Sequence, residues 1–237
     1  MVGRALVVAA HGSNEPAVNE HIIELARRAG QRLGFDEAIA AFHQGDPCFS
    51  RALDGLSSEE VVVVPLLQSE GYYCHRVLPA ELAKNDRFGR VRLRQTRAVG
   101  VHPALDDVLE RRVRELCALH ELDAPAVALV GHGTPRHPGS SQAAESSAAT
   151  LARRTGLETR AFFLDEEPTV DVLPAFAPDR DLIVLPLLIG AGRHVARDLT
   201  RRLDVARASR RVVIDRPLGL DAAIEEIVVE LAAPPPY

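Results

Sequence analysis

The sequence predicts two doubly wound α/β domains in tandem, each built on a parallel β-sheet. The main observation is an internal repeat, because the run Ala5–Ser13 is matched by Ala126–Thr134, and Val61–Leu67 by Leu182–Leu188. Both matches keep a shift of 121 positions, and chance does not keep such a register, so we interpret the chain as a tandem duplication. A second observation is that short β-branched runs alternate with longer amphipathic stretches in each half.

The length of the chain agrees with two domains. Its 237 residues divide into halves of about 120, and each half is long enough to bury a core of its own. The join falls near residues 120–125, so the predicted domains are residues 1–121 and 122–237. The residues from Ala232 onward end in Ala-Pro-Pro-Pro-Tyr and predict a frayed tail.

Strands and helices are expected to alternate four times in each half. The runs Val61–Val64 and Leu182–Leu185 are continuously apolar, as is typical of parallel strands covered on both faces. The strands expected in the first half are 4–10, 37–42, 60–66 and 92–98, and the helices are 16–33, 48–55, 76–84 and 103–120. The strands expected in the second half are 125–130, 158–163, 181–187 and 211–215, and the helices are 141–155, 169–175, 194–204 and 220–232.

Composition restricts the possible classes of function. The net charge of −5 gives no support to binding of nucleic acid or an anionic membrane. No apolar run approaches the ~18 residues of a membrane span, and the N-terminus has no signal-peptide layout. The cysteines, Cys48, Cys74 and Cys117, form no Cys-x-x-Cys pair, which argues against a disulfide framework and favours a reducing cytoplasm. We therefore predict a cytoplasmic protein that binds neither nucleic acid nor membranes.

Two histidines in each half are predicted at the carboxyl ends of strands, where open parallel sheets bind ligands. His11 and His132 leave the first strand of each half and precede a glycine, which permits a tight turn. His75 and His194 follow the third strand at a shift of 119, so two extra residues are expected between Leu67 and His75. Neutral imidazoles from neighbouring strand ends suit a divalent metal, and all four histidines are therefore predicted ligands.

The exit of the second strand supplies the candidates for an acidic partner. Asp165 and Glu166 stand there in the second half, as a metal ligand or as a proton acceptor, and the sequence does not choose between them. The first half has Gln44 at the position of Asp165, which weakens a third ligand on that side. His43 lies close to the same edge. Cys74 is interpreted as a half-buried structural thiol.

Three segments resemble class II tetrapyrrole chelatases of the sirohydrochlorin cobaltochelatase (CbiX-like) type. They are the strand that ends in His-Gly-Ser, the Phe-x-x-Glu/Asp stretch before proline, and the pattern Val-Pro-Leu-Leu…Gly-x-His-Val-x-x-Asp. The resemblance spans almost the full chain, once per half. The second half is the closer match, over Leu185–Asp198, whereas the first half has the longer segment Gln68–His75 without the His-Val-x-x-Asp ending.

The resemblance implies two flavodoxin-like, chelatase-like domains with a cleft between them. In this cleft a divalent metal, Co²⁺ or Fe²⁺, would be inserted into sirohydrochlorin or a similar carboxylate-rich tetrapyrrole during cobalamin or sirohaem biosynthesis. The metal is then a substrate, and no organic cofactor is expected. His11, His75, His132 and His194 would be the catalytic and metal-binding residues. Short family members form the cleft by dimerising, so a duplicated chain is expected to work as a monomer.

Two alternatives to a chelatase are open from the sequence. The altered first-half motif favours a non-catalytic carrier of metal or tetrapyrrole with the same fold, and turnover distinguishes the two because a carrier saturates stoichiometrically. A His-Gly pair after a first strand also suggests a histidine phosphatase. That chemistry needs an arginine immediately before the histidine, and Ala10 and Gly131 stand there instead.

Overall fold

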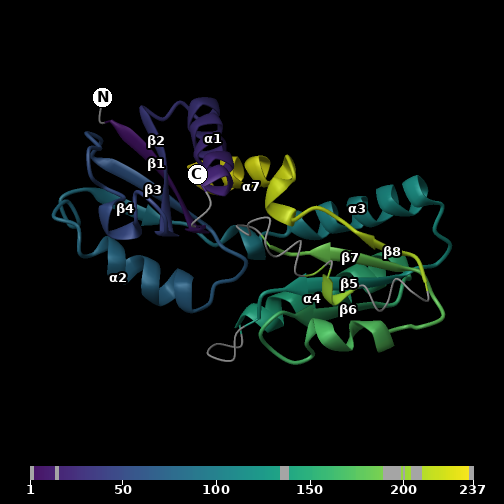
Figure 1. Cartoon of the computed structure of the whole chain (residues 1–237). Coiled ribbons are helices and arrows are strands. Elements are labelled where there is room, and N and C mark those ends of the chain that lie inside the picture. Colours follow the sequence, from purple (N-terminus) through teal and green to yellow (C-terminus); the bar gives the residue numbers. More distant parts are fainter. Residues whose placement is uncertain are drawn as a thin grey trace. The chain divides into compact units, whose positions relative to one another are not determined.

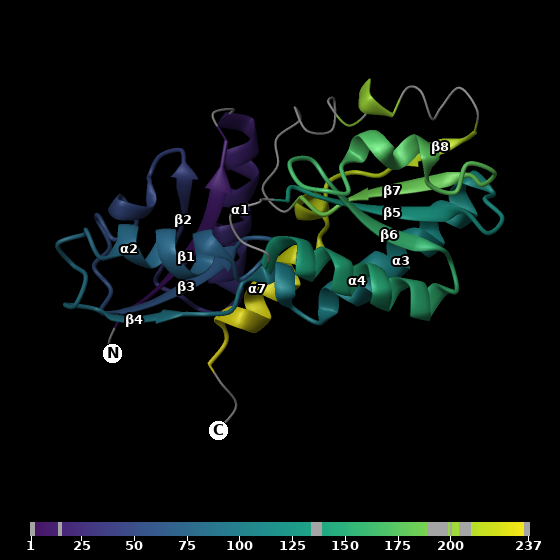
Figure 2. The same cartoon turned by 90° about the horizontal axis from the view of Figure 1, so that it is seen from below.

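Two four-stranded parallel sheets form the framework of the protein (Figures 1 and 2). The computed structural model describes residues 3–13, 16–133, 139–188, 199, 201–203 and 210–234. Within these ranges the chain divides into two compact units, each with one sheet. The strand order is β2-β1-β3-β4 in the first unit and β6-β5-β7-β8 in the second. The predicted class, two parallel-sheet α/β domains, is confirmed.

The first sheet is covered on both faces. Its strands are β1 (Arg4–Gly12), β2 (Glu37–Gln44), β3 (Glu60–Leu66) and β4 (Arg92–Gln95). One face packs against α1 (Pro16–Arg32) and α7 (Ala223–Ala232). The other packs against a 3₁₀ turn at Phe49–Arg51 and the short helix α2 (Leu78–Leu82). Residues 5–10 of β1 are fully buried, because a strand between two helical layers needs apolar side chains on both sides.

The second sheet repeats this plan. Its strands are β5 (Ala126–Gly131), β6 (Thr159–Phe163), β7 (Leu182–Pro186) and β8 (Val212–Ile214). The helices α3 (Ala104–His120) and α4 (Gly139–Thr155) pack against one face (Figure 2). The other face packs against a 3₁₀ segment at Val170–Ala175 and the buried side chains of Leu199 and Leu203. No helix in the described part of the chain is long and apolar enough to cross a membrane.

Several predicted elements differ in length from those observed. The helices expected at 48–55 and 169–175 are 3₁₀ segments at Phe49–Arg51 and Val170–Ala175. The second of these contains Pro174, which has no backbone N–H to donate within a longer helix. The strand expected at 92–98 already ends at Gln95. The helix expected at 194–204 lies largely outside the described residues.

The last helix of each repeat belongs to the unit built from the other repeat. One unit combines the described residues up to His102 with those from Asp221 onward, and the other lies between Pro103 and Leu220. The helix α7, which ends the second repeat, lies beside α1 and contacts β3 (Figures 1 and 2), whereas α3 contacts α4 and β7. The compact units therefore do not follow the predicted boundaries, 1–121 and 122–237, because each of these helices buries its apolar face against the sheet of the other repeat.

The shift of 121 positions holds further along the chain than predicted. Leu78 and Leu82 are buried in the core of the first unit, and Leu199 and Leu203 are buried in the core of the second. Both pairs keep the shift of 121, and they follow Leu67, after which a shift of 119 is predicted.

The two extra residues of the first half lie shortly before its fourth strand. In the first sheet Val61 pairs with Leu93, and in the second sheet Leu182 pairs with Val212. The shift is therefore 121 at the third strand of each half and 119 at the fourth. The predicted insertion before His75 is wrong, since the difference in length arises after α2.

Candidate active site

The carboxyl ends of β5 and β6 bring His132 and Asp165 together. Nδ1 of His132 lies 3.2 Å from a carboxylate oxygen of Asp165, and the two side chains are 59% and 61% exposed. The backbone N–H groups of Leu164 and Asp165 each donate to the carbonyl oxygen of His132 at 3.0 Å, which fixes one strand exit against the other. An imidazole and a carboxylate are thus held side by side and open to solvent.

Glu166, the other predicted acidic residue, has a different neighbour. The hydroxyl of Ser141 on α4 donates to its Oε1 at 3.1 Å, and Ser141 is buried. Asp165 is therefore the acidic residue in contact with His132. The predicted ligand His194 lies outside the described residues, so its pairing with His132 stays a prediction.

A glycine is required directly after each of these first histidines. At Gly133 φ is +73°, and an added Cβ would lie 2.7 Å from Cβ of Phe163 and 2.9 Å from Cβ of Glu166. At Gly12 φ is +75°, and an added Cβ would lie 2.2 Å from the carbonyl oxygen of Gln44. Only glycine permits both this φ and this close approach, which together bring the exits of the first and second strands into contact.

Replacing Gly133 by alanine should therefore displace His132 and weaken the metal binding that is predicted for it. We expect the free energy of unfolding to fall by about 2–4 kcal/mol, because the left-handed φ and the collision with Phe163 both disfavour the native backbone. Gly156→Ala is the matched control, since Gly156 has the same φ of +73° but nothing within 4 Å of an added Cβ. Chemical denaturation and Co²⁺ titration of both variants check the prediction, and equal Co²⁺ affinity in the two would contradict it.

In the first unit, three aromatic rings meet at the corresponding edge of the sheet. The ring centroids of His11 and His43 are 5.3 Å apart, and the ring of Tyr73 lies 5.2 Å from His11 and 5.0 Å from His43. All three contacts are edge to face. His43 comes from the end of β2 and Tyr73 from a π-helix at Tyr73–Val77. The sequence alone gave Tyr73 no role. It could have been found from the shift of 121, which aligns Tyr73 with His194.

His75 does not take part in these ring contacts within the described residues. Its side chain is exposed on the π-helix. Hydrogen bonds from Arg97 lower the pKa of Glu70 against the opposing effect of burial, and the charge of the nearby His75 adds a smaller contribution in the same direction. At the shift of 121 the position equivalent to His194 is Tyr73. The roles of His75 and His194 as metal ligands stay predictions.

The candidate metal ligands in the described residues form a pair and not a larger cluster. Among the residues that the structure describes, no three His, Cys, Asp or Glu side chains converge as a metal site. The pair His132–Asp165 supplies one nitrogen and one oxygen donor. A pair of protein ligands binds a divalent ion weakly compared with a closed site of four ligands, which suits an ion that is later released.

Cys74 is a structural thiol, as interpreted from the sequence. It is 1% exposed and packs with Leu67 and Ala98. Burial raises the pKa of this thiol to about 11, the charge of Glu70 adds to the effect, and a hydrogen bond from Gln95 opposes it. Burial and the raised pKa both disfavour the thiolate, which agrees with a structural role for Cys74.

Cys74 should therefore resist alkylation in the folded protein. At pH 8 a thiol with a pKa of about 11 is ionised in about one molecule in a thousand, and burial also blocks access. Mass mapping after iodoacetamide treatment should find Cys74 labelled only after unfolding, with the less buried Cys48 as the internal reference. Rapid labelling of Cys74 under native conditions would contradict its assignment.

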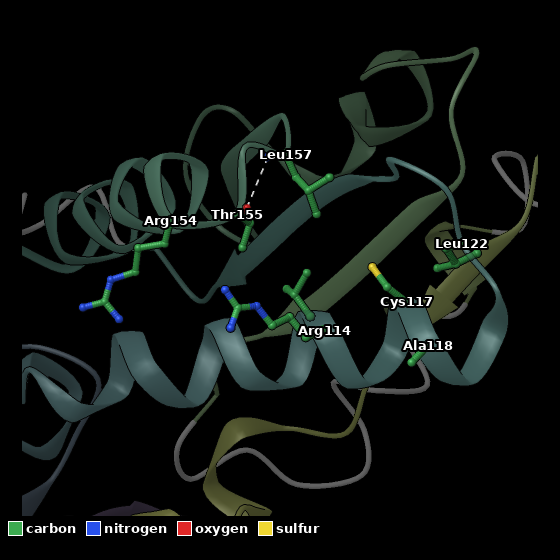
Figure 3. Close-up of a pocket in the computed structure, with 8 residues that line it drawn as sticks. Arg114, Cys117, Ala118, Leu122, Arg154, Thr155 and Leu157 are labelled. Carbon is green, nitrogen blue, oxygen red and sulfur yellow. Dashed lines mark hydrogen bonds between the residues drawn. The ribbon is translucent and has the colours of Figure 1, made fainter.

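A hollow of about 460 Å³ lies on the second unit (Figure 3). Leu122 precedes β5 and Leu157 precedes β6, so the hollow lies at the amino ends of the strands. Its two arginines, Arg114 and Arg154, are both paired with carboxylates on α3. The residues that line it are Val113, Arg114, Cys117, Ala118, Leu122, Arg154, Thr155 and Leu157. The hollow is therefore separate from the His132–Asp165 pair.

Comparison with known proteins shows a family match in both repeats. The CbiX family model matches residues 5–116 and again residues 126–233. A probable sirohydrochlorin cobaltochelatase from Halobacterium salinarum is 32% identical over 220 residues, which cover 83% of this chain and 75% of that protein.

Solved structures share the fold. The chain resembles DR2241 from Deinococcus radiodurans, a multi-domain protein with structural similarity to chelatases, with a TM-score of 0.75 at 24% identity over 98% of this chain. It spans 55% of the length of that protein. SirB from Bacillus subtilis, solved with Fe³⁺, gives a TM-score of 0.82 at 15% identity, over 97% of this chain and 94% of SirB. With the family model matched in both repeats, the chain belongs to the CbiX family of chelatases.

Proposed function

We propose that the protein inserts a divalent metal, Co²⁺ or Fe²⁺, into sirohydrochlorin or a similar carboxylate-rich tetrapyrrole. The observation that carries the proposal is the exposed His132–Asp165 pair at the carboxyl edge of a parallel sheet, where such folds bind ligands. The relative from Halobacterium is named for cobalt, and SirB was solved with Fe³⁺. Both names support a first-row metal, and imidazole and carboxylate donors accept either ion.

The pair can serve two steps of such a reaction. A carboxylate 3.2 Å from Nδ1 of His132 favours the tautomer with its proton on that nitrogen, so that the lone pair of Nε2 is available to the metal. Insertion also releases two pyrrole N–H protons, of which the carboxylate of Asp165 can accept one, while the other passes to solvent at this exposed edge. His132 would then hold the ion while Asp165 orients the imidazole and takes up a proton.

We assign insertion to the second repeat because both partners of its first histidine are changed in the first repeat. Gln44 stands at the position of Asp165, and Tyr73 stands at the position of His194. His194 enters this assignment from the sequence alone. His11 keeps an imidazole at the first sheet, where Gln44 takes the place of the carboxylate of Asp165.

The test is catalytic turnover with Co²⁺ and sirohydrochlorin. Purified protein should convert many equivalents of the macrocycle, seen as a change in its visible spectrum, much faster than the reaction without protein. Fe²⁺ under anaerobic conditions and Ni²⁺ are assayed in parallel. His120→Ala is a matched control for His132→Ala, because His120 is exposed at the end of α3 in the same unit.

Two results would overturn the proposal. The first is a rate with all three metals that is no faster than the rate without protein. The second is conversion that stops at one macrocycle per chain, which would identify a carrier with the same fold.

A further inference from the structure

The aromatic cluster of the first unit is exposed at its outer side. Tyr72 is 49% exposed and Tyr73 is 38% exposed, and their ring centroids are 5.8 Å apart. The chain has three tyrosines and no tryptophan, so two of its three tyrosines stand next to each other at this edge. Two neighbouring exposed rings together offer an apolar surface on which a flat ligand can pack.

The rings are held in place from behind. Tyr73 contacts His11 and His43 edge to face, with centroids 5.2 Å and 5.0 Å away. His43 in turn lies 6.1 Å from the buried ring of Phe49. Such edge-to-face packing restricts the ring of Tyr73, and a restricted ring loses little conformational entropy when a flat ligand binds.

The π-helix adds a positive charge beside the rings. Arg76 is exposed on the same turn, and its guanidinium forms no ion pair or hydrogen bond with any residue in the described ranges. The nearby Arg97, in contrast, is paired with Glu70. His75 is exposed next to Arg76 and is a second potential donor. A π-helix inside an α-helical turn is frequently found at functional sites.

We propose that the first repeat has exchanged its metal site for a binding surface for the tetrapyrrole, formed by Tyr72, Tyr73 and Arg76. A flat conjugated macrocycle packs its face on the tyrosine rings, and its peripheral carboxylates pair with the guanidinium of Arg76. The inference rests on the proposed function, since it assigns the two repeats to the two substrates: the second repeat holds the metal and the first holds the macrocycle.

The test separates binding of the macrocycle from binding of the metal. Metal-free sirohydrochlorin is titrated into the full chain and followed by its own absorbance, and the KM for Co²⁺ is measured separately. Tyr72→Ala and Tyr73→Ala should each raise the Kd for sirohydrochlorin about tenfold, and Arg76→Ala about fivefold. Tyr73→Phe should stay within about twofold of the parent, because the ring and not the hydroxyl makes the contact.

Matched controls lie on the same unit but at the amino end of β4. Phe88 is 44% exposed and Arg90 is exposed, so Phe88→Ala and Arg90→Ala remove a similar ring and a similar charge elsewhere. Both should keep the parent Kd. The KM for Co²⁺ should stay within about twofold in all of these variants.

Three outcomes would overturn the inference. The first is an unchanged Kd in both tyrosine-to-alanine variants. The second is a loss with Tyr73→Phe equal to that with Tyr73→Ala, since the hydroxyl would then be the contact. The third is that binding weakens only in those variants whose melting temperature falls further than that of Phe88→Ala, since the weaker binding would then reflect a loss of stability. Failure of the proposed function shows differently: a parent protein that binds sirohydrochlorin through these rings but never turns over refutes the chelatase and leaves the binding surface in place.

Discussion

His132→Ala should lower kcat for metal insertion by about two to four orders of magnitude, the largest catalytic effect we expect from a single substitution. The imidazole is the nitrogen donor of the proposed insertion site, and it stands 3.2 Å from Asp165. Asp165→Asn should cost about ten- to a hundredfold, because the amide no longer orients the imidazole or accepts a proton. Initial rates at saturating macrocycle, together with the KM for Co²⁺, check both values.

Variants of Glu166 and His75 are the controls for the losses expected at His132 and Asp165. Glu166→Gln should lose much less activity than Asp165→Asn, because Glu166 faces the hydroxyl of Ser141. His75→Ala should retain most of the activity, since His75 is exposed on the π-helix and Tyr73 aligns with His194 at the shift of 121. Equal losses from the His75 and His132 variants would show that insertion is wrongly assigned to the second repeat.

The strands and the first histidine of each half could be predicted because their signals are local. Residues 5–10 and 126–130 are apolar without interruption, and the structure buries all of them between two layers. A parallel strand with both faces covered needs this pattern, so it can be read without knowledge of the partners. His11 and His132 directly end such runs, and a histidine that ends a parallel strand lies at the ligand-binding edge.

The position of His75 could not be predicted in the same way. A histidine-to-histidine match after the third strand favours a shift of 119, whereas the buried leucines of the two cores keep the shift at 121. One matching residue type is weaker information than the burial of Leu78 and Leu199, which only the fold provides. The same reason hides Tyr73, whose role depends on the rings around it and not on any motif.

The exchange of the last helices also could not be predicted from the sequence. The amphipathic pattern of residues 220–232 correctly predicts a helix with one buried face. The pattern does not say which of two similar sheets covers that face. Both repeats have the same strand order, so either sheet offers a comparable apolar surface.

Deleting α7 should unfold the first unit, although α7 belongs to the second repeat. Ile224, Ile227 and Val228 are at most 1% exposed, and burial of side chains of this size stabilises the fold by ~1.5–3 kcal/mol each. Three of them contribute about 5–9 kcal/mol, a large part of the ~5–15 kcal/mol that stabilises a domain. A chain that ends at Leu220 should therefore lose the cooperative unfolding transition of the unit that contains β1–β4.

Polar contacts determine where α7 lies. Arg28 on α1 binds Glu225 at 2.6 Å, and Arg32 binds Glu226 with both of its terminal nitrogens. These side chains are partly exposed, so each pair adds less than about 1 kcal/mol. Arg94 of β4 donates to carbonyl oxygens at the end of α7. The apolar face supplies most of the free energy, and the ion pairs fix the register against α1.

Ile227→Ala tests the exchange without shortening the chain. It should lower the free energy of unfolding by about 2–5 kcal/mol, whereas Leu119→Ala on α3, at a side chain 74% exposed, should change it by about 0.5 kcal/mol or less. Hydrogen exchange should show lost protection in β1 and β3, the strands of the first repeat. Val113→Ala in α3 should expose β5 and β7 instead, because Val113 is buried in the second unit. If each variant instead affected the strands of its own repeat, the exchange of helices would be contradicted. If each variant affects the strands of the other repeat, neither repeat can complete its core without the helix of the other.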